Sequence, residues 1–206
     1  MDVGLKSLRM VTTKKIILAS SSPRRKELME GLGLSFEIRV KDGIDESYPS
    51  GLSCEDIPVY IAHAKASAYT LKSDELLITA DTIVWVDGQV LGKPHSHQEA
   101  SDMLRLLSGR THQVITGVCL TTENETRSFA CITDVTFATL SPQEIEYYVH
   151  RYRPFDKAGA YGVQEWIGYV GVTELRGSYF NVMGLPVQRL YTELKKMGIV
   201  NTQPLV

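Results

Sequence analysis

The sequence has few cysteines, no long apolar run and no excess of charge of either sign. Its three cysteines are odd in number and widely spaced (Cys54, Cys119 and Cys131), which argues against a disulfide framework or a zinc knuckle and is typical of a reducing compartment. No apolar run approaches the ~18 residues that a membrane span needs. The formal net charge of −2 argues against a general coat for nucleic acid or anionic membranes. We therefore expect a cytoplasmic protein with neither a nucleic-acid nor a membrane partner.

The chain is long enough for one large domain or two small lobes. It has 206 residues, of which 43% are hydrophobic and 22% charged, and this is ordinary globular composition. It contains no internal repeat and no Pro/Gly/Ser linker that would separate two domains. We expect a flexible extension over 1–14, a single α/β domain over 15–200 and a short tail over 201–206.

Apolar runs alternate with helix-start signals along the chain. Serines followed by proline or an acidic residue predict helix starts near residues 20–23, 53–56, 96–99 and 141–144. Apolar and β-branched runs predict strands at 15–20, 36–40, 76–86, 90–91, 112–122, 127–139 and 166–175, and a last helix is predicted over 184–197. The alternation is typical of a mixed α/β fold.

Asp81 is the acidic residue that fits a purely structural role least well. It lies within the apolar run LLITADTIVWV at 76–86. A carboxylate there is costly to bury unless it binds a metal, is paired, or lies in a cleft. The structural alternatives are an aspartate that caps a nearby helix or one that is paired in the core.

Several basic residues occupy positions that suit an anion. Arg24 and Arg25 fall in the first turn of a predicted helix, where the helix dipole disfavours cations unless an anion docks there. Lys93 lies between a glycine and a proline at the end of a predicted strand. The alternatives are two solvated arginines and a turn lysine. The spacing of a P-loop is absent.

Two loops add further polar candidates. Asp42, Asp45 and Glu46 cluster before the predicted helix that carries Lys65, and carboxylates of this kind can hold Mg²⁺ or Mn²⁺. Solvated loop acids and a surface lysine are the alternatives. The loop at 156–164 combines small residues, which allow close approach of a ligand, with Lys157 and Gln164. The five histidines show no metal-ligand spacing, and no nucleophile elbow is present.

Five motifs in order resemble the Maf family of nucleoside triphosphate pyrophosphatases, the septum-formation-inhibitor-like proteins. They are ILASSSPRRKEL at 17–28, ADTIV at 80–84, GKP at 92–94, LSGRTH at 107–112 and DKAGAYGVQ at 156–164. The resemblance extends from about Lys15 to Lys195. It implies an elongated mixed sheet flanked by helices, with two lobes around a central cleft, and a homodimer.

The resemblance also implies an activity and a set of site residues. The activity is the metal-assisted hydrolysis of a nucleoside triphosphate to the monophosphate and pyrophosphate, and the version of the last motif is similar to the branch that prefers dTTP and UTP. Carried over by motif, Asp81 is the proton acceptor. As a mechanistic hypothesis, we expect Glu46 and Asp81 to hold Mg²⁺ or Mn²⁺. The positions linked to substrate choice are Arg24, Thr82 and Gln164, and the polar cleft positions are Ser20, Glu46, Lys65, Lys93 and Lys157.

Two positions depart from the family pattern. His63 stands where the family often has a first lysine before Lys65, and Glu165 stands where glycine is common after the glutamine. Two other functions would use the same cationic cleft. One is a non-catalytic nucleotide-binding regulator of cell division, and the other is a metal-dependent phosphatase that releases orthophosphate from monophosphates.

Overall fold

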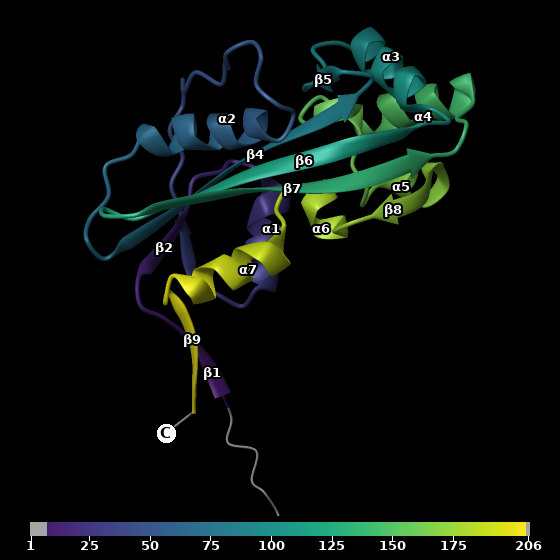
Figure 1. The fold of residues 1–206 in the computed structure, drawn as a ribbon. Helices are drawn as coiled ribbons and strands as arrows, with labels where there is room; N and C mark the ends of the chain where they lie inside the picture. Colours follow the sequence, from purple (N-terminus) through teal and green to yellow (C-terminus); the bar gives the residue numbers. More distant parts are fainter. Residues whose placement is uncertain (1–7, 205–206) are drawn as a thin grey trace, which may run out of the picture.

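A mixed sheet runs the length of the protein, and helices cover both of its faces (Figure 1). The computed structural model describes residues 8–204, with side chains described over 10–202. The elements are β1 (Leu8–Thr12), β2 (Lys15–Leu18), α1 (Pro23–Gly31), β3 (Phe36–Ile38), α2 (Asp56–Ser67), β4 (Glu75–Val86), β5 (Gln89–Leu91), α3 (His97–Leu107), β6 (Thr111–Thr121), β7 (Thr126–Phe137), α4 (Pro142–Tyr152), the 3₁₀ turn η1 (Ala158–Ala160), α5 (Trp166–Gly171), β8 (Val172–Arg176), α6 (Tyr179–Met183), α7 (Val187–Lys196) and β9 (Val200–Pro204).

The sheet has seven strands of mixed direction. Its order is β3-β2-β4-β6-β7-β8, and β5 pairs with the far end of β4. Strand β2 is parallel to β3 and β4, whereas the other pairings are antiparallel. The long strands β4, β6 and β7 give the sheet its elongated shape (Figure 1). The predicted mixed α/β fold is confirmed.

The two faces of the sheet are covered unequally. Side chains of β4 alternate, so Leu77 and Ile83 pack in the clusters under α2, whereas Ala80 and Val84 belong to the larger core on the other face. Helix α2 covers its face of β4, β6 and β7, and α1, α6 and α7 lie on the opposite side (Figure 1). Neighbouring residues of β4 therefore reach different layers of the protein.

Gly117 on β6 allows α2 to pack directly against the sheet. It is the register partner of Asp81 on β4, so both positions face the same side of the sheet. A Cβ atom built on Gly117 would lie 2.3 Å from the carbonyl carbon of Pro58 and from the amide nitrogen of Val59 in α2. The missing side chain thus sets how closely α2, which carries Lys65, approaches the strand that carries Asp81.

We expect Gly117→Ala to lower the free energy of unfolding by ~1–3 kcal/mol, because the added methyl group forces the backbone of α2 away from the sheet. Denaturant unfolding would measure the change. Gly31→Ala is the matched control, since a Cβ at that position meets no atom within 4 Å. Equal stability of the two variants would contradict this account of the packing.

Three of the four helix starts predicted at serines are confirmed, whereas α2 begins at Asp56 with Glu55 as its N-cap and no side-chain capping bond, so Ser53 is not the cap. Ser22, Ser96 and Ser141 are the N-cap residues of α1, α3 and α4, and each side chain accepts a hydrogen bond from a first-turn amide. At Ser141 the reciprocal bond from Glu144 completes a capping box. None of the helices within residues 8–204 combines the length and the apolar composition needed to cross a membrane.

The segments predicted near the C-terminus differ from the structure in two places. A single strand was expected over 166–175, but Trp166–Gly171 forms α5 and the strand β8 begins at Val172. A single helix was expected over 184–197, but Gly184 ends α6 with φ +115° and α7 begins only at Val187. The β-branched residues of 166–175 favoured a strand, and tertiary packing outweighs that preference in the short helix α5. In the second segment the left-handed Gly184 and the following Leu185 and Pro186 lie between α6 and α7, so the helix starts later than predicted.

The ends of the chain also differ from expectation. Leu8–Thr12 pairs with Val200–Pro204 in an antiparallel two-stranded sheet, so neither the expected extension nor the expected tail is free of structure over these residues. The sequence separation of the two strands explains why they were not predicted from local patterns. Residues 1–7 and 205–206, which belong to the same two expectations, lie outside the described residues.

Candidate active site

An opening in the sheet lies beside the middle of β4. Strand β2 pairs with residues 75–78 of β4, and β5 pairs with residues 84–86. Between these pairings, residues 79–83 have no strand neighbour on that edge within the described chain. Asp81 and Thr82 lie in this stretch and point to opposite faces, so an open edge lets both side chains reach one space.

A cavity of about 400 Å³ occupies this opening. Its walls come from the loop between β2 and α1, the loop before α2, the middle of β4, and the loop that contains η1. All nine residues predicted for the site line it: Ser20, Arg24, Glu46, Lys65, Asp81, Thr82, Lys93, Lys157 and Gln164. The structure therefore brings together residues that are up to 144 positions apart in the sequence.

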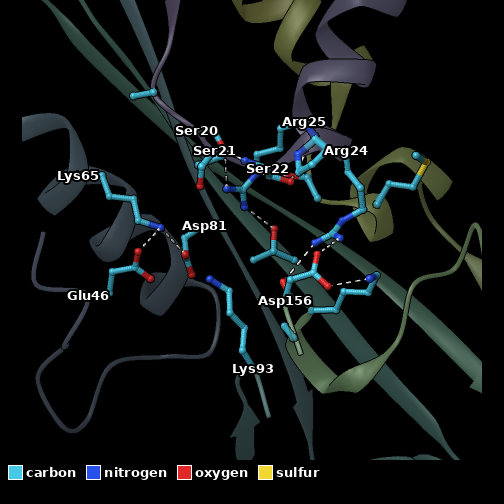
Figure 2. A pocket seen from close by; sticks show the side chains of 18 of the residues that line it. Ser20, Ser21, Ser22, Arg24, Arg25, Glu46, Lys65, Asp81, Lys93 and Asp156 are labelled. Atoms are coloured by element: carbon cyan, nitrogen blue, oxygen red, sulfur yellow. Dashed lines mark hydrogen bonds and ion pairs between the residues drawn. The ribbon is translucent and has the colours of Figure 1, made fainter. Parts of the chain in front are cut away.

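Lys65 joins the two predicted metal-binding carboxylates on the α2 side of the cavity (Figure 2). Its amine lies 2.7 Å from Asp81 Oδ1 and 3.1 Å from Glu46 Oε1. The side chains of Lys65 and Asp81 are only 14% and 13% exposed, whereas that of Glu46 is 49% exposed. Asp81 is thus a paired, largely buried acid at the edge of a cavity. Two interpretations that its sequence left open, a paired aspartate and an aspartate in a cleft, therefore both apply.

Arg25 occupies the opposite wall of the cavity. Its guanidinium donates to Gly184 O at 2.8 Å and to Thr82 Oγ1 at 3.1 Å, and Thr82 Oγ1 also contacts Thr116 Oγ1 at 3.0 Å. Burial lowers the pKa of Arg25 below its ordinary value, and the negative charge of Asp81 opposes that change. The hydroxyl of Thr82 is thereby committed to fixing Arg25 within the cavity wall.

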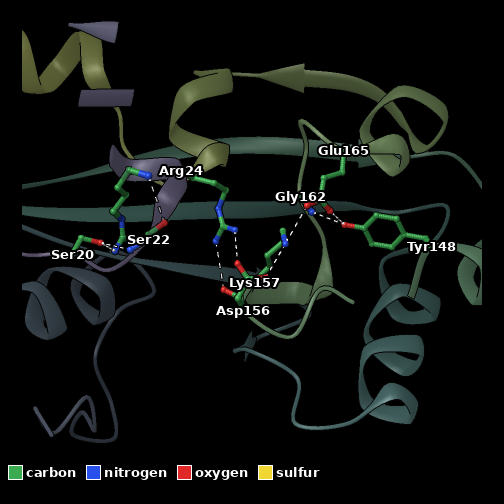
Figure 3. Close-up of polar contacts among 9 residues, drawn as sticks. Ser20, Ser22, Arg24, Tyr148, Asp156, Lys157, Gly162 and Glu165 are labelled. Carbon is green, nitrogen blue, oxygen red and sulfur yellow. Dashed lines mark hydrogen bonds and ion pairs between the residues drawn. The ribbon is translucent and has the colours of Figure 1, made fainter. Parts of the chain in front are cut away.

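Arg24 points to a different part of the wall, next to the loop at 156–164 (Figure 3). Its guanidinium donates to Asp156 Oδ2 at 2.7 Å, and Lys157 Nζ donates to Asp156 Oδ1 at the same distance. Burial raises the pKa of Asp156, but the hydrogen bonds from Lys157 and Arg24 outweigh this effect and hold the pKa below its ordinary value. Asp156 therefore stays ionised and ties α1 to the loop.

Three further predicted residues complete the lining. Ser20 is buried, and its Oγ accepts from the amide of Ser22 at 3.2 Å. Lys93 is exposed and extends into the same opening as Asp81 (Figure 2). Gln164 Oε1 is buried and has no hydrogen-bond partner within the described residues. An unpartnered buried acceptor is costly, so this atom suits a donor on a ligand.

The cavity carries more positive than negative side chains. Six basic side chains line it together with four acidic ones, namely Arg24, Arg25, Lys41, Lys65, Lys93 and Lys157 against Asp42, Glu46, Asp81 and Asp156. Several cations in one partly enclosed space suit a polyanion with closely spaced charges. A chain of phosphates meets that description.

The carboxylates beside Lys65 fit a hard divalent cation. Asp81 and Glu46 supply oxygen ligands to one point, and Mg²⁺ is usually bound through one or two carboxylates together with substrate phosphates and waters. Within the described residues no group of three or more His, Cys, Asp or Glu side chains could hold an ion without further ligands. The residues present therefore fit an ion whose coordination is completed by a bound phosphate.

The sequence did not distinguish all of the residues that shape the cavity. Arg25 was singled out with Arg24, but adjacent positions in a predicted helix give no sign of which side chain enters the site. Asp156 is the first residue of the motif at 156–164, but no function was predicted for it. Tyr148 gave no local signal, and Glu165, which it contacts behind the loop, was noted only as a departure from the family's usual glycine (Figure 3).

Comparison with known proteins adds independent information. A family model described as Maf-like protein matches residues 15–197. A Phocaeicola vulgatus protein named dTTP/UTP pyrophosphatase is 64% identical over 185 residues, which cover 89% of this chain and 96% of that protein. A Porphyromonas gingivalis protein of the same name is 57% identical over 191 residues, covering 91% of this chain and 96% of that protein.

The fold also has a counterpart among solved structures. The Staphylococcus aureus Ham1 protein superposes with a TM-score of 0.51 at 16% identity, over 89% of this chain and 100% of that chain. At this level of identity the likeness concerns the fold alone.

Proposed function

The chain belongs to the Maf family, and on that premise we propose that it hydrolyses dTTP and UTP to the monophosphate and pyrophosphate in a house-cleaning role. The observation that carries the proposal is the pairing of a strand-borne carboxylate, Asp81, with Lys65 in a cavity lined by basic side chains. The names of the similar Phocaeicola and Porphyromonas proteins support the choice of substrate.

The basic side chains would bind the triphosphate. Lys65 and Lys93 flank Asp81, and Lys157 lies 9% exposed at the far side of the same cavity. Positive charge in a partly buried space stabilises the negative charge that develops on the phosphate oxygens during cleavage. We therefore assign the α-phosphate to the neighbourhood of Asp81 and Lys65, with the other phosphates extending toward the remaining cations.

Asp81 would take the proton from the attacking water. The water oxygen forms a bond to the α-phosphorus, the bond from that phosphorus to the bridging oxygen breaks, and pyrophosphate leaves with the electron pair. Lys65, whose amine lies 2.7 Å from Asp81 Oδ1, keeps the carboxylate oriented until the water is in place. The products are then one monophosphate and one pyrophosphate for each water consumed.

A divalent ion, Mg²⁺ or Mn²⁺, would be held by Asp81 and Glu46 together with the phosphate oxygens. When bound, it neutralises phosphate charge and makes water a stronger acid. Because Lys65 contacts both carboxylates, its amine must share them with the ion. This arrangement supports binding of the nucleotide and the ion as one complex.

Gln164 would read the base. Uracil and thymine both present an N–H donor at N3 between two carbonyl acceptors, and a primary amide offers the complementary acceptor and donors. The buried, unpartnered Oε1 of Gln164 is available to accept from N3–H. Cytosine has an acceptor at N3, so it would leave Oε1 unsatisfied. Thr82 and Arg24 would assist base recognition indirectly. The hydroxyl of Thr82 holds Arg25, and the guanidinium of Arg24 holds Asp156.

The experiment that tests this proposal is a panel of all the common NTPs and dNTPs with Mg²⁺, in which pyrophosphate and orthophosphate are detected separately. We expect pyrophosphate from dTTP and UTP in preference to the other nucleotides. Binding without product release would favour a regulator that carries out no chemistry. Orthophosphate release from monophosphates would favour a phosphatase.

The family resemblance further supports a homodimer in the cytoplasm, without nucleic-acid or membrane partners. All three cysteines are unpaired thiols, which agrees with a reducing compartment. Exposed aromatic side chains around α4 and α5, among them Tyr147 and Tyr169, offer apolar surface that a second copy could bury. Sedimentation at micromolar concentration would test the dimer.

A further inference from the structure

Tyr148 lies behind the segment that carries Gln164 and contacts this segment on both sides of that residue. The side chain of Tyr148 projects from α4, is fully buried, and stacks on Tyr152 with ring centroids 5.0 Å apart. Its hydroxyl accepts from the amide of Gly162 at 3.0 Å and donates to Glu165 Oε2 (Figure 3). A single phenol group therefore fixes the loop two residues before Gln164 and one residue after it.

Glu165 extends this contact to the phosphate side of the cavity. Its second carboxylate oxygen, Oε1, lies 3.1 Å from Lys157 Nζ. Lys157 in turn bonds Asp156, which accepts from Arg24. The hydrogen bonds and ion pairs form one continuous chain from α4 through the loop to α1 (Figure 3).

We propose that Tyr148 and Glu165 are positioning residues that hold Gln164 against the pyrimidine base and Lys157 toward the phosphates. This inference rests on the proposed function and names the groups that set its base preference. We call the pair the Tyr148–Glu165 clamp.

The packing around Gly162 supports the clamp. A Cβ atom built on Gly162 would lie 3.0 Å from both Gln164 Nε2 and the carboxyl carbon of Glu165, so the loop folds tightly over this residue. The amide of Gln164 is thus held against the backbone that Tyr148 anchors. Without the anchor, the buried Oε1 of Gln164 would lose the fixed position from which it can select a donor.

The protonation states of the clamp suit this role. Burial raises the pKa of Tyr148, and the hydrogen bond to Glu165 raises it further. The phenol therefore keeps its proton throughout the neutral range and always donates to the carboxylate. Lys157 then pairs with a side chain that has little freedom to move, because Glu165 is only 20% exposed.

Tyr148→Phe tests the clamp, because it keeps the stacked ring and removes only the hydroxyl. We expect KM for dTTP and UTP to rise by ~10-fold with a smaller change in kcat, since a small misplacement of a positioning group weakens recognition. The ratio of kcat/KM for dTTP over dCTP should fall by a similar factor. Tyr147→Phe is the control, since Tyr147 is 50% exposed and keeps its ring contact with Trp166.

Glu165→Gln gives a second test at the loop itself. The glutamine can still accept from Tyr148 but offers no charge to Lys157, so we expect KM to rise while the preference for dTTP over dCTP is largely kept. The double variant Tyr148→Phe/Glu165→Gln should be less impaired than the product of the two single effects, because the two residues act as one unit.

Three outcomes separate the clamp from simpler accounts. Folded single variants with the KM and the dTTP/dCTP ratio of the unaltered protein would overturn it. A loss of melting temperature and kcat with no change in KM or in the ratio would overturn it too, because the role would then be structural. Failure of the unaltered protein to release pyrophosphate from dTTP would instead overturn the proposed function. If Tyr148→Phe does not fold, the KM of Glu165→Gln decides, and a KM equal to that of the unaltered protein would overturn the clamp.

Discussion

Asp81→Asn is expected to lower kcat for pyrophosphate release from dTTP by ~10³-fold, within the range for removal of a general base. The substitution replaces one carboxylate oxygen by an amide group and keeps an acceptor for Lys65, whose amine lies 2.7 Å from Oδ1. The side chain can then neither take a proton from water nor supply a charged ligand to the metal. Steady-state kinetics with separate detection of pyrophosphate would measure the loss.

The control for this variant lies at the end of the same strand. Asp87→Asn changes an exposed aspartate in the β4–β5 turn, at φ +49°, a conformation that asparagine also adopts readily. It should keep full activity. Turnover by folded Asp81→Asn that matches the unaltered protein would remove Asp81 from the reaction.

Lys65→Met should lower kcat/KM for dTTP by ~10²–10³-fold, which is the cost of removing one group that stabilises developing charge. Methionine preserves most of the length and the apolar stem of lysine but has no charge. Asp81 and Glu46 would then face each other and the phosphates without the cation that now contacts both. Initial rates over a range of nucleotide and Mg²⁺ concentrations would measure the effect.

The same titration gives a second readout for Lys65. Because its amine shares the two carboxylates with the proposed ion, the variant should reach half-maximal rate at a lower Mg²⁺ concentration. Lys26→Met is the control, since the Lys26 side chain is 53% exposed and pairs with Glu30 on the surface of α1. Equal kcat/KM for Lys65→Met and Lys26→Met would contradict the assigned role.

Much of the site could be predicted because its residues violate local rules. Asp81 interrupts an apolar strand, and Arg24 and Arg25 occupy a helix start that disfavours cations. Such conflicts between local chemistry and local structure mark functional positions. The order of five short motifs then connected these positions to one family, and the cavity is lined by all of the residues so chosen.

The remaining features depend on contacts between distant segments. The sequence shows two adjacent arginines, but only the packing of α1 against β4 sends Arg25 to Thr82 and Arg24 to Asp156. The clamp joins α4 to a loop through the side chain of Tyr148, and its residues obey every local rule. Neither feature conflicts with local structure, and the departure of Glu165 from the family pattern did not show which residue it contacts.

The misassigned segments have the same cause. Residues 166–175 carry the β-branched side chains of a strand, yet α5 forms because Gly168 lets the turn close on Val163, whose carbonyl oxygen would lie 1.8 Å from a Cβ atom there. The terminal strands β1 and β9 pair across almost the whole chain. In both cases a tertiary contact outweighs the local preference.

The alternation of side chains along β4 explains how this strand contributes to both walls of the cavity. Asp81 faces α2 and Lys65, whereas its neighbour Thr82 faces α1 and Arg25. Because β4 has an open edge between β2 and β5, both layers reach the same cavity. On the proposed function, the bond is cleaved on the α2 side, and the loop at 156–164 serves both the phosphates, through Lys157, and the base, through Gln164.

The central claim is that water attacks the α-phosphorus of the nucleotide, and hydrolysis of dTTP in oxygen-18-labelled water tests it most directly. The account predicts one labelled oxygen in the monophosphate, an unlabelled pyrophosphate and no orthophosphate. Label in the pyrophosphate, or release of orthophosphate in its place, would show that another bond is cleaved and would contradict the account.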